Sequence, residues 1–69
     1  MDEFTIKDDF IKLGQAIKAA GLVESGVEAK IVIQSGQVKV NGLVETQRGK
    51  KLVGGEVIEY KGNKLTIKK

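Results

Sequence analysis

The chain has 69 residues, of which 41% are hydrophobic and 30% are charged, and it contains neither cysteine nor histidine. This length predicts one domain with a small core, and the composition excludes both an intrinsically disordered chain and a membrane-spanning helix. Without cysteine or histidine there are no disulfides and no thiolate or imidazole metal ligands, and the usual proton-transfer groups for catalysis near neutral pH are missing.

The net charge of +3 is unevenly distributed along the chain. Residues 1–10 hold four acidic residues and one basic residue, a net −3, whereas residues 11–69 hold eleven basic and five acidic residues, a net +6. A basic body attracts polyanions, so nucleic acid or an anionic surface is the expected class of partner. Residues 1–10 lack the pattern of a secretory signal, and we expect a cytoplasmic protein.

The first half of the chain predicts a short extended segment followed by two helices. Residues 4–6 alternate as in a strand, and residues 10–11 are again extended after an acidic break. Apolar residues at helical spacing then run from Leu13 to Ala20, and Gly21 ends this first helix. Residues 22–24 link it to the second helix, whose apolar stripe we expect to face the first.

Ser25 and Glu28 predict the start of the second helix. They have the spacing of a capping box, in which the serine hydroxyl accepts from the N–H of Glu28 and the carboxylate accepts from the N–H of Ser25. Ala29, Val32 and Ile33 form an apolar stripe, and a glycine at 36 is typical of a helix end.

The second half of the chain predicts β structure only. A strand over residues 38–40 leads into Asn41-Gly42, the strongest short signal for a type I′ hairpin turn, and a returning strand over 43–46. Residues 47–51 form a basic connection, followed by two apolar anchors, Leu52 and Val53. The remaining expected elements are a glycine turn at 54–55, a strand at 56–60, a tight reversal at 61–64 and a last strand at 65–67.

Catalytic and metal sites are poorly supported by the residues present. Ser25 is far better explained as a helix cap than as a nucleophile. The acidic residues of positions 2–9 lack the spacing of a calcium loop, and a solvated tail explains them. We therefore expect a protein that is not an enzyme and that has no cofactor, no metal and no small-molecule substrate.

A phosphate-binding surface is better supported by the residues present. The second helix exposes backbone N–H groups at Gly26 and Val27 together with the positive end of its dipole, and Lys30 lies one turn further on. Clustered bases often do no more than solvate a surface, so charge pattern alone leaves both interpretations open. The two phenylalanines, Phe4 and Phe10, are expected in the core, which favours structured RNA over stacked single strands.

Four segments of the sequence closely resemble one family, the RNA-binding domain named after ribosomal small-subunit protein four. They are LGQAIKAAGLV (13–23), SGVEAK (25–30), GQVKVNG (36–42) and GGEVI (54–58). The resemblance covers residues 12–60, and SGVEAKIVIQSGQVKVNG is similar to short bacterial proteins that consist of little else. Together with the length, charge and strand pattern, this predicts a single RNA-binding domain over 1–69. It has an acidic segment with a short strand at 1–11, the family-like core at 12–60 and a terminal strand at 61–69.

The resemblance implies an α+β fold in which a helix-turn-helix precedes a small, twisted, mainly antiparallel sheet. It also implies a non-catalytic module that binds structured or ribosomal RNA across the second helix and the adjoining hairpin. The RNA-binding positions carried over from the family are Ser25, Gly26, Lys30, Lys39, Asn41, Arg48, Lys50 and Lys51.

Two positions depart from the family pattern. Many members have an arginine after the capping serine and a base after the following lysine, whereas this chain has Gly26 and Ile31. The side-chain contacts of the second helix with RNA are therefore expected to be weaker. Ile31 either packs against Phe4 or Phe10 or forms a partner contact, and the alternative function is a protein-interaction module associated with ribosomes or translation.

Overall fold

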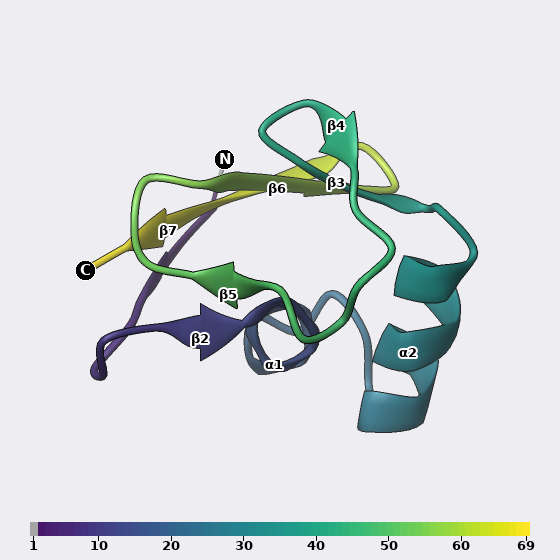
Figure 1. The fold of residues 1–69 in the computed structure, drawn as a ribbon, viewed down its shortest axis with the longest axis horizontal. Coiled ribbons are helices and arrows are strands. Elements are labelled where there is room, and N and C mark those ends of the chain that lie inside the picture. The colour runs from purple at the N-terminus through teal and green to yellow at the C-terminus, as the bar shows by residue number, and fades with distance from the viewer. Residues whose placement is uncertain (1) are drawn as a thin grey trace.

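A computed structural model describes residues 2–69, which form two helices and seven strands (Figure 1). The helices are α1 (Leu13–Ala19) and α2 (Gly26–Gln34). The strands are β1 (Asp2–Thr5), β2 (Ile11–Lys12), β3 (Val38–Val40), β4 (Leu43–Val44), β5 (Lys51–Leu52), β6 (Val57–Tyr60) and β7 (Asn63–Lys68). The predicted α+β fold, with two helices ahead of a mainly antiparallel sheet, is confirmed.

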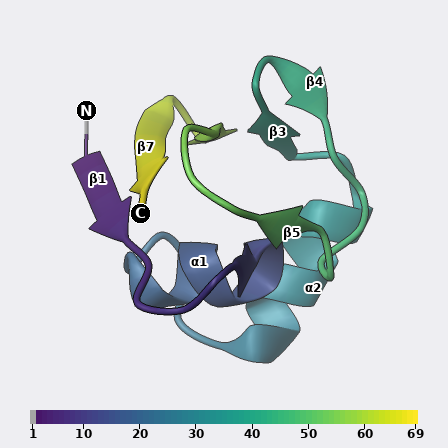
Figure 2. The same ribbon diagram turned by 60° about the vertical axis from the view of Figure 1, so that its left-hand side comes forward.

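Five strands form one sheet in the order β1-β7-β6-β3-β4. β1 pairs with β7 in parallel, and the other neighbours are antiparallel. The first and last strands within residues 2–69 therefore lie side by side (Figure 2). Most of the sheet is made by local hairpins, whose turns the sequence predicts.

Both sheet hairpins turn through residues in the left-handed region. Asn41 and Gly42 have φ of 53° and 83°, which confirms the type I′ prediction between β3 and β4. Lys61 and Gly62 have φ of 51° and 78° and join β6 to β7. Because this second turn is so tight, β7 already begins at Asn63, two residues earlier than the sequence predicts.

The two helices pack against one face of the sheet and enclose a single core (Figure 1). The apolar residues predicted for the second helix, Ala29, Val32 and Ile33, are all buried. β3, β6 and β7 contribute alternate residues to the same core, as expected for strands with one solvated face. The fully buried side chains of largest volume are Leu13, Ile17, Ile33, Leu52, Ile58, Leu65, Ile67 and Val38.

A second, two-stranded sheet is absent from the sequence-based prediction. β2 pairs with β5 in the register Ile11↔Leu52 and Lys12↔Lys51. β5 lies where the sequence predicts the end of the basic connection and the first of the two apolar anchors. Leu52 is fully buried, but the side chain of Val53 is 55% exposed, so its expected role as an anchor is wrong. β5 ends at Leu52, so the strand that places Leu52 in the core does not extend to Val53.

The structure also corrects the expected position of Phe10 and the length of the returning strand, and it shows where Ile31 lies. Phe10 is 38% exposed and lies outside the core. Phe4 is partly buried and packs against the core. The returning strand of the first hairpin is limited to Leu43–Val44, shorter than the expected 43–46, and both of its residues are exposed. Ile31 is 59% exposed, so its side chain is solvated on the outer side of α2.

Candidate nucleic-acid interface

Ser25 caps α2 as predicted. Its backbone is extended, and its Oγ accepts a hydrogen bond of 3.1 Å from the N–H of Glu28. The reciprocal bond expected of a capping box is not formed, because the Glu28 carboxylate accepts from the N–H of Glu24 at 2.7 Å instead. The first backbone bond of the helix runs from Ala29 N–H to the Ser25 carbonyl, at 3.0 Å. The N–H groups of Gly26 and Val27 therefore precede the hydrogen-bonded ladder of the helix.

The basic connection is fixed onto the start of α1 by two backbone hydrogen bonds. Leu13 N–H donates to the carbonyl of Lys50 at 2.8 Å, and Gly14 N–H donates to the carbonyl of Arg48 at 3.0 Å. A Cβ at Gly14 would lie 3.5 Å from the Cβ of Arg48, so the loop and the helix are in close contact. These bonds satisfy two N–H groups at the helix start and hold Arg48 beside it.

An open depression lies where the starts of both helices meet this loop. We refer to it as the helix-start groove, and it is lined by Lys12, Gly14, Gln15, Lys18, Gly26, Ala29, Arg48 and Gly49. Three of the lining residues are basic and none is acidic. The N-terminus of α2 adds its own positive potential at Gly26. The groove is therefore an electropositive surface built from three separate segments of the chain.

The groove contains two of the predicted RNA-binding residues and two that the prediction missed. Gly26 and Arg48 are predicted from the sequence, and the fold brings them together. Lys12 and Lys18 are absent from the prediction. Both are exposed, and together with Gln15 they occur at intervals of three residues and line the groove from the side of α1. This three-residue spacing is the sequence signal that could have predicted them, because positions three apart lie on the same face of a helix.

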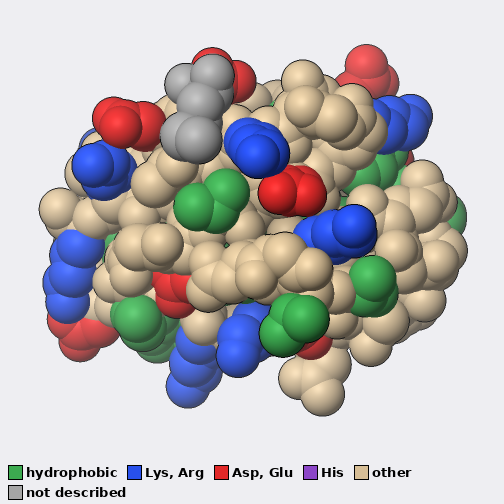
Figure 3. Space-filling view, turned by 90° about the horizontal axis from the view of Figure 1, so that it is seen from above, with side chains coloured by type: hydrophobic (Ala, Val, Ile, Leu, Met, Phe, Trp, Pro, Cys, Tyr) green, Lys and Arg blue, Asp and Glu red, His purple; other side chains and the backbone are tan. Residues whose placement is uncertain are grey.

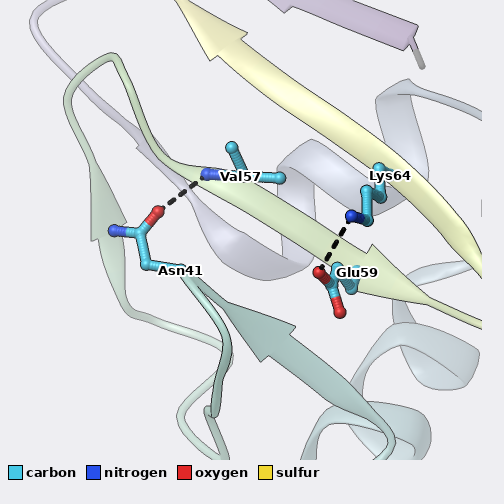
Figure 4. A network of polar contacts seen from close by, with 4 residues as sticks. All are labelled: Asn41, Val57, Glu59 and Lys64. Carbon is cyan, nitrogen blue, oxygen red and sulfur yellow. Dashed lines mark hydrogen bonds and ion pairs between the residues drawn. The ribbon is translucent and has the colours of Figure 1, made fainter.

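Lys39 lies elsewhere, on the solvated face of the five-stranded sheet. It lines a different depression together with Glu59 and Lys64. In the sheet register Lys39 lies opposite Glu59, which lies opposite Lys64. Glu59 and Lys64 form an ion pair of 3.8 Å (Figure 4). Basic and acidic side chains are interspersed on this side of the molecule (Figure 3), which makes it a weaker attractor for polyanions than the groove.

Asn41 has a structural contact that accounts for its identity. Its Oδ1 accepts a hydrogen bond of 2.9 Å from the N–H of Val57 (Figure 4). Its own N–H donates to the carbonyl of Val57 at 2.8 Å. The side chain therefore binds the start of β6 to the β3–β4 turn, and its predicted contact with RNA stays a prediction.

The other predicted bases do not line the helix-start groove. Lys30 is exposed and follows Ala29 in α2. Lys51 lies on β5, where its Nζ is 4.8 Å from the centroid of the Phe10 ring. Lys50 is exposed and lies near enough to Glu56 to act on the pKa of that carboxyl. The contacts of these residues with RNA also stay predictions.

Comparison with known protein families identifies the fold around this groove. The S4 domain matches residues 4–68, nearly the whole chain. The chain belongs to the S4 domain family. The resemblance predicted from four short segments is thereby confirmed, and the matched range extends beyond residues 12–60 on both sides.

Bacterial relatives of this S4 domain share its length. YbcJ of Escherichia coli (strain K12) is 39% identical over 61 residues, which cover 88% of this chain and 87% of YbcJ. The solution structure of YbcJ, reported to reveal an ALFAL motif involved in RNA-binding, matches with a TM-score of 0.77 and 37% identity. It covers 100% of this chain and 89% of that one. The "Probable ribosome maturation protein RlbA" of Bacillus subtilis (strain 168) is 38% identical over 58 residues, covering 84% and 82% of the two chains.

Residues 2–69 contain neither a membrane-spanning helix nor a cluster of metal ligands. Neither helix in this range has the length and apolar character needed to cross a membrane. Within the same range, no group of three or more acidic side chains is placed to hold a metal ion.

Proposed function

We propose that this S4 domain binds structured RNA of the ribosome and holds its phosphates in the helix-start groove. The observation that carries the proposal is the lining of the groove, where Lys12, Lys18 and Arg48 meet the start of α2 with no acidic residue among them. The RNA-binding motif reported for YbcJ and the ribosome-maturation name of RlbA support the same class of partner.

Each part of the groove has a distinct role in this proposal. The exposed N–H groups at the start of α2 donate to phosphate oxygens, and Gly26 has no side chain to keep the phosphate away. Arg48 presents a planar donor set that suits two phosphate oxygens at once, while Lys12 and Lys18 act as point charges. Phosphate contacts of this kind recognise the shape of an RNA backbone and not its sequence.

Salt dependence tests the proposal quantitatively. Neutralising about three to four phosphates predicts that log K falls against log salt with a slope of about −3. The measurement is fluorescence anisotropy of labelled ribosomal RNA fragments across a series of salt concentrations. The absence of binding at low salt, or an affinity that salt does not change, would refute the proposal.

Matched lysine-to-alanine and arginine-to-alanine variants locate the contacts. Lys18→Ala with Arg48→Ala is expected to weaken binding and reduce the salt slope by about two, one for each phosphate contact removed. Lys39→Ala with Lys61→Ala removes the same charge from the depression on the sheet and is the control. Equal losses of RNA affinity in the two double variants would contradict a phosphate site confined to the groove. Lys39 would then contribute as much to RNA binding as the groove residues.

A protein contact is a second candidate function, favoured by exposed apolar residues. β4 is an edge strand of the sheet, and Leu43 and Val44 are 75% and 55% exposed. An open edge with apolar side chains is a suitable surface for another protein. Leu43→Lys with Val44→Thr is expected to release the domain from ribosomal particles whose RNA has been digested. Undiminished binding of this variant to the digested particles would exclude the candidate.

A further inference from the structure

Phe10 is an aromatic residue on the surface, beside the helix-start groove. It is 38% exposed and lines a third depression, the Phe10 depression, with Phe4, Thr5, Lys7, Asp8, Ile11, Gln15 and Ala19. Gln15 lines both depressions. The two therefore adjoin at the first turn of α1, with bases concentrated in one and apolar side chains in the other.

The Phe10 depression has the chemistry of a site for a nucleobase. Phe4 and Ile11 supply further apolar surface beside the Phe10 ring. The Nζ of Lys51 lies 4.8 Å from the ring centroid, so a positive charge accompanies the aromatic surface. Single-stranded nucleic acid is bound by this combination elsewhere, because the base stacks on the ring while the cation attracts the backbone.

We propose that Phe10 is the stacking platform for one unpaired base of the RNA whose backbone lies in the helix-start groove. This inference rests on the proposed function and makes it more specific. The preferred target is an RNA helix interrupted by an unpaired nucleotide, such as a bulge, since a base inside a continuous helix has no free face to stack on Phe10.

Lys7 and Asp8, which both line the Phe10 depression, influence which part of the nucleotide it favours. The exposed carboxylate of Asp8 offsets the charge of Lys7, so the depression attracts a phosphate less strongly than the groove does. The same carboxylate can accept hydrogen bonds from the amino and imino groups of a base. The base therefore enters the Phe10 depression, and the phosphates remain in the groove, where no acidic residue lines the surface.

Tryptophan fluorescence tests the stacking directly, because the chain contains no tryptophan. Phe10→Trp places one indole at the proposed platform, and Leu43→Trp places one on the exposed edge strand β4 as a control. Each variant is titrated with two RNA hairpins of equal length, one fully paired and one with a single bulged adenine. Quenching is expected only for Phe10→Trp with the bulged hairpin.

Binding affinities provide a second readout. The unmodified chain is expected to bind the bulged hairpin about tenfold more tightly than the paired one, a typical contribution of one stacked base. Phe10→Leu keeps an apolar side chain but is expected to lose this preference while binding the paired hairpin as before. The quenching is measured on Phe10→Trp and the preference on the unmodified chain. Both measurements therefore still test the proposal if Phe10→Leu fails to fold.

The outcomes separate this proposal from the one on which it rests. Equal affinity of the unmodified chain for both hairpins, or a preference that survives Phe10→Leu, overturns the stacking site and leaves the phosphate site in place. Quenching of Leu43→Trp to the same extent as Phe10→Trp also overturns it. Failure to bind either hairpin at low salt overturns both proposals.

Discussion

Asn41 illustrates how one side chain can serve two structural needs at once. Its φ of 53° lies in the left-handed region, which asparagine tolerates better than most residues. Its Oδ1 also accepts from the N–H of Val57, sixteen residues further along the chain. Asn41 thereby holds the β3–β4 turn to the start of β6, a strand that lies outside this hairpin.

Substitution of Asn41 separates this structural role from the predicted RNA contact. Asn41→Ala is expected to lower the free energy of unfolding by about 1–2 kcal/mol, because the hydrogen bond is lost and alanine is strained at positive φ. Asn41→Asp keeps the acceptor and is expected to remain stable in urea denaturation. Its RNA affinity should also be unchanged. A stable Asn41→Asp variant that binds RNA several times more weakly would mean that this side chain faces a phosphate.

Glu56 fixes the glycine turn that precedes β6. Its two carboxylate oxygens accept from the N–H groups of Val53 and Gly54, each at 2.8 Å. Partial burial alone would raise the pKa of Glu56, but these hydrogen bonds, one from its own N–H and the charge of Lys50 together lower it. The folded chain therefore favours the ionised form of this carboxyl more than the unfolded chain does.

The lowered pKa of Glu56 makes its contribution to stability depend on pH. Because the folded-state pKa is below the unfolded-state value, the contribution is complete above the unfolded value and disappears as the pH falls through the folded one. Glu56→Gln is therefore expected to reduce the melting temperature at about pH 7, with the difference from the unmodified chain shrinking towards about pH 3.

Thermal unfolding followed by circular dichroism across this pH range measures the effect. Glu24→Gln removes an exposed carboxylate of the α1–α2 connection and is the control. A constant difference between Glu56→Gln and the unmodified chain at every pH would contradict the role assigned to the charge of Glu56.

The second helix depends on its cap and its packing. α2 has 9 residues, which is too short to be stable alone in water. Its buried stripe of Ala29, Val32 and Ile33 supplies the tertiary contacts, and Ser25 supplies the only side-chain cap at its start among the described residues. The same helix start forms one wall of the groove, so stability and the proposed RNA binding both depend on the residues around Ser25.

Two substitutions at Ser25 distinguish these contributions. Ser25→Ala is expected to lower the free energy of unfolding by about 1 kcal/mol through loss of the cap. Ser25→Asp keeps a capping oxygen and should preserve stability, but its negative charge beside Gly26 is expected to weaken RNA binding. Chemical denaturation and RNA titration of both variants measure the two effects. Unchanged RNA affinity in a folded Ser25→Asp protein would move the phosphate site away from this helix start.

Elements with local signals could be predicted from the sequence, and those defined by distant partners could not. The Ser25 cap and the Asn41-Gly42 turn each depend on residues within one helical turn or one hairpin. β2 and β5 have two residues each and exist because they pair with one another across about forty residues. No periodicity is detectable in a segment of two residues, so this sheet emerges only from the tertiary fold.

On the scale of the whole molecule, the candidate site is only partly predictable for a related reason. Gly26 is expected from helix chemistry and Arg48 from the density of bases, but their proximity depends on the hydrogen bonds from Leu13 and Gly14 to the basic loop. Those bonds also bring Lys12 into the groove. Charge counts along a sequence cannot show that Lys39 lies in a separate depression beside Glu59, because this requires the register of the sheet.

The parallel pairing of β1 with β7 has a consequence for biosynthesis. Asp2 lies beside Leu65 and Thr5 beside Lys68, so the first of the seven described strands to be synthesised adjoins the last of them. Until residues 63–68 have been synthesised and have left the exit tunnel, β1 has no neighbour to which it can add. The helices and the first hairpin can assemble before that point, whereas β1 joins the sheet only once β7 is available.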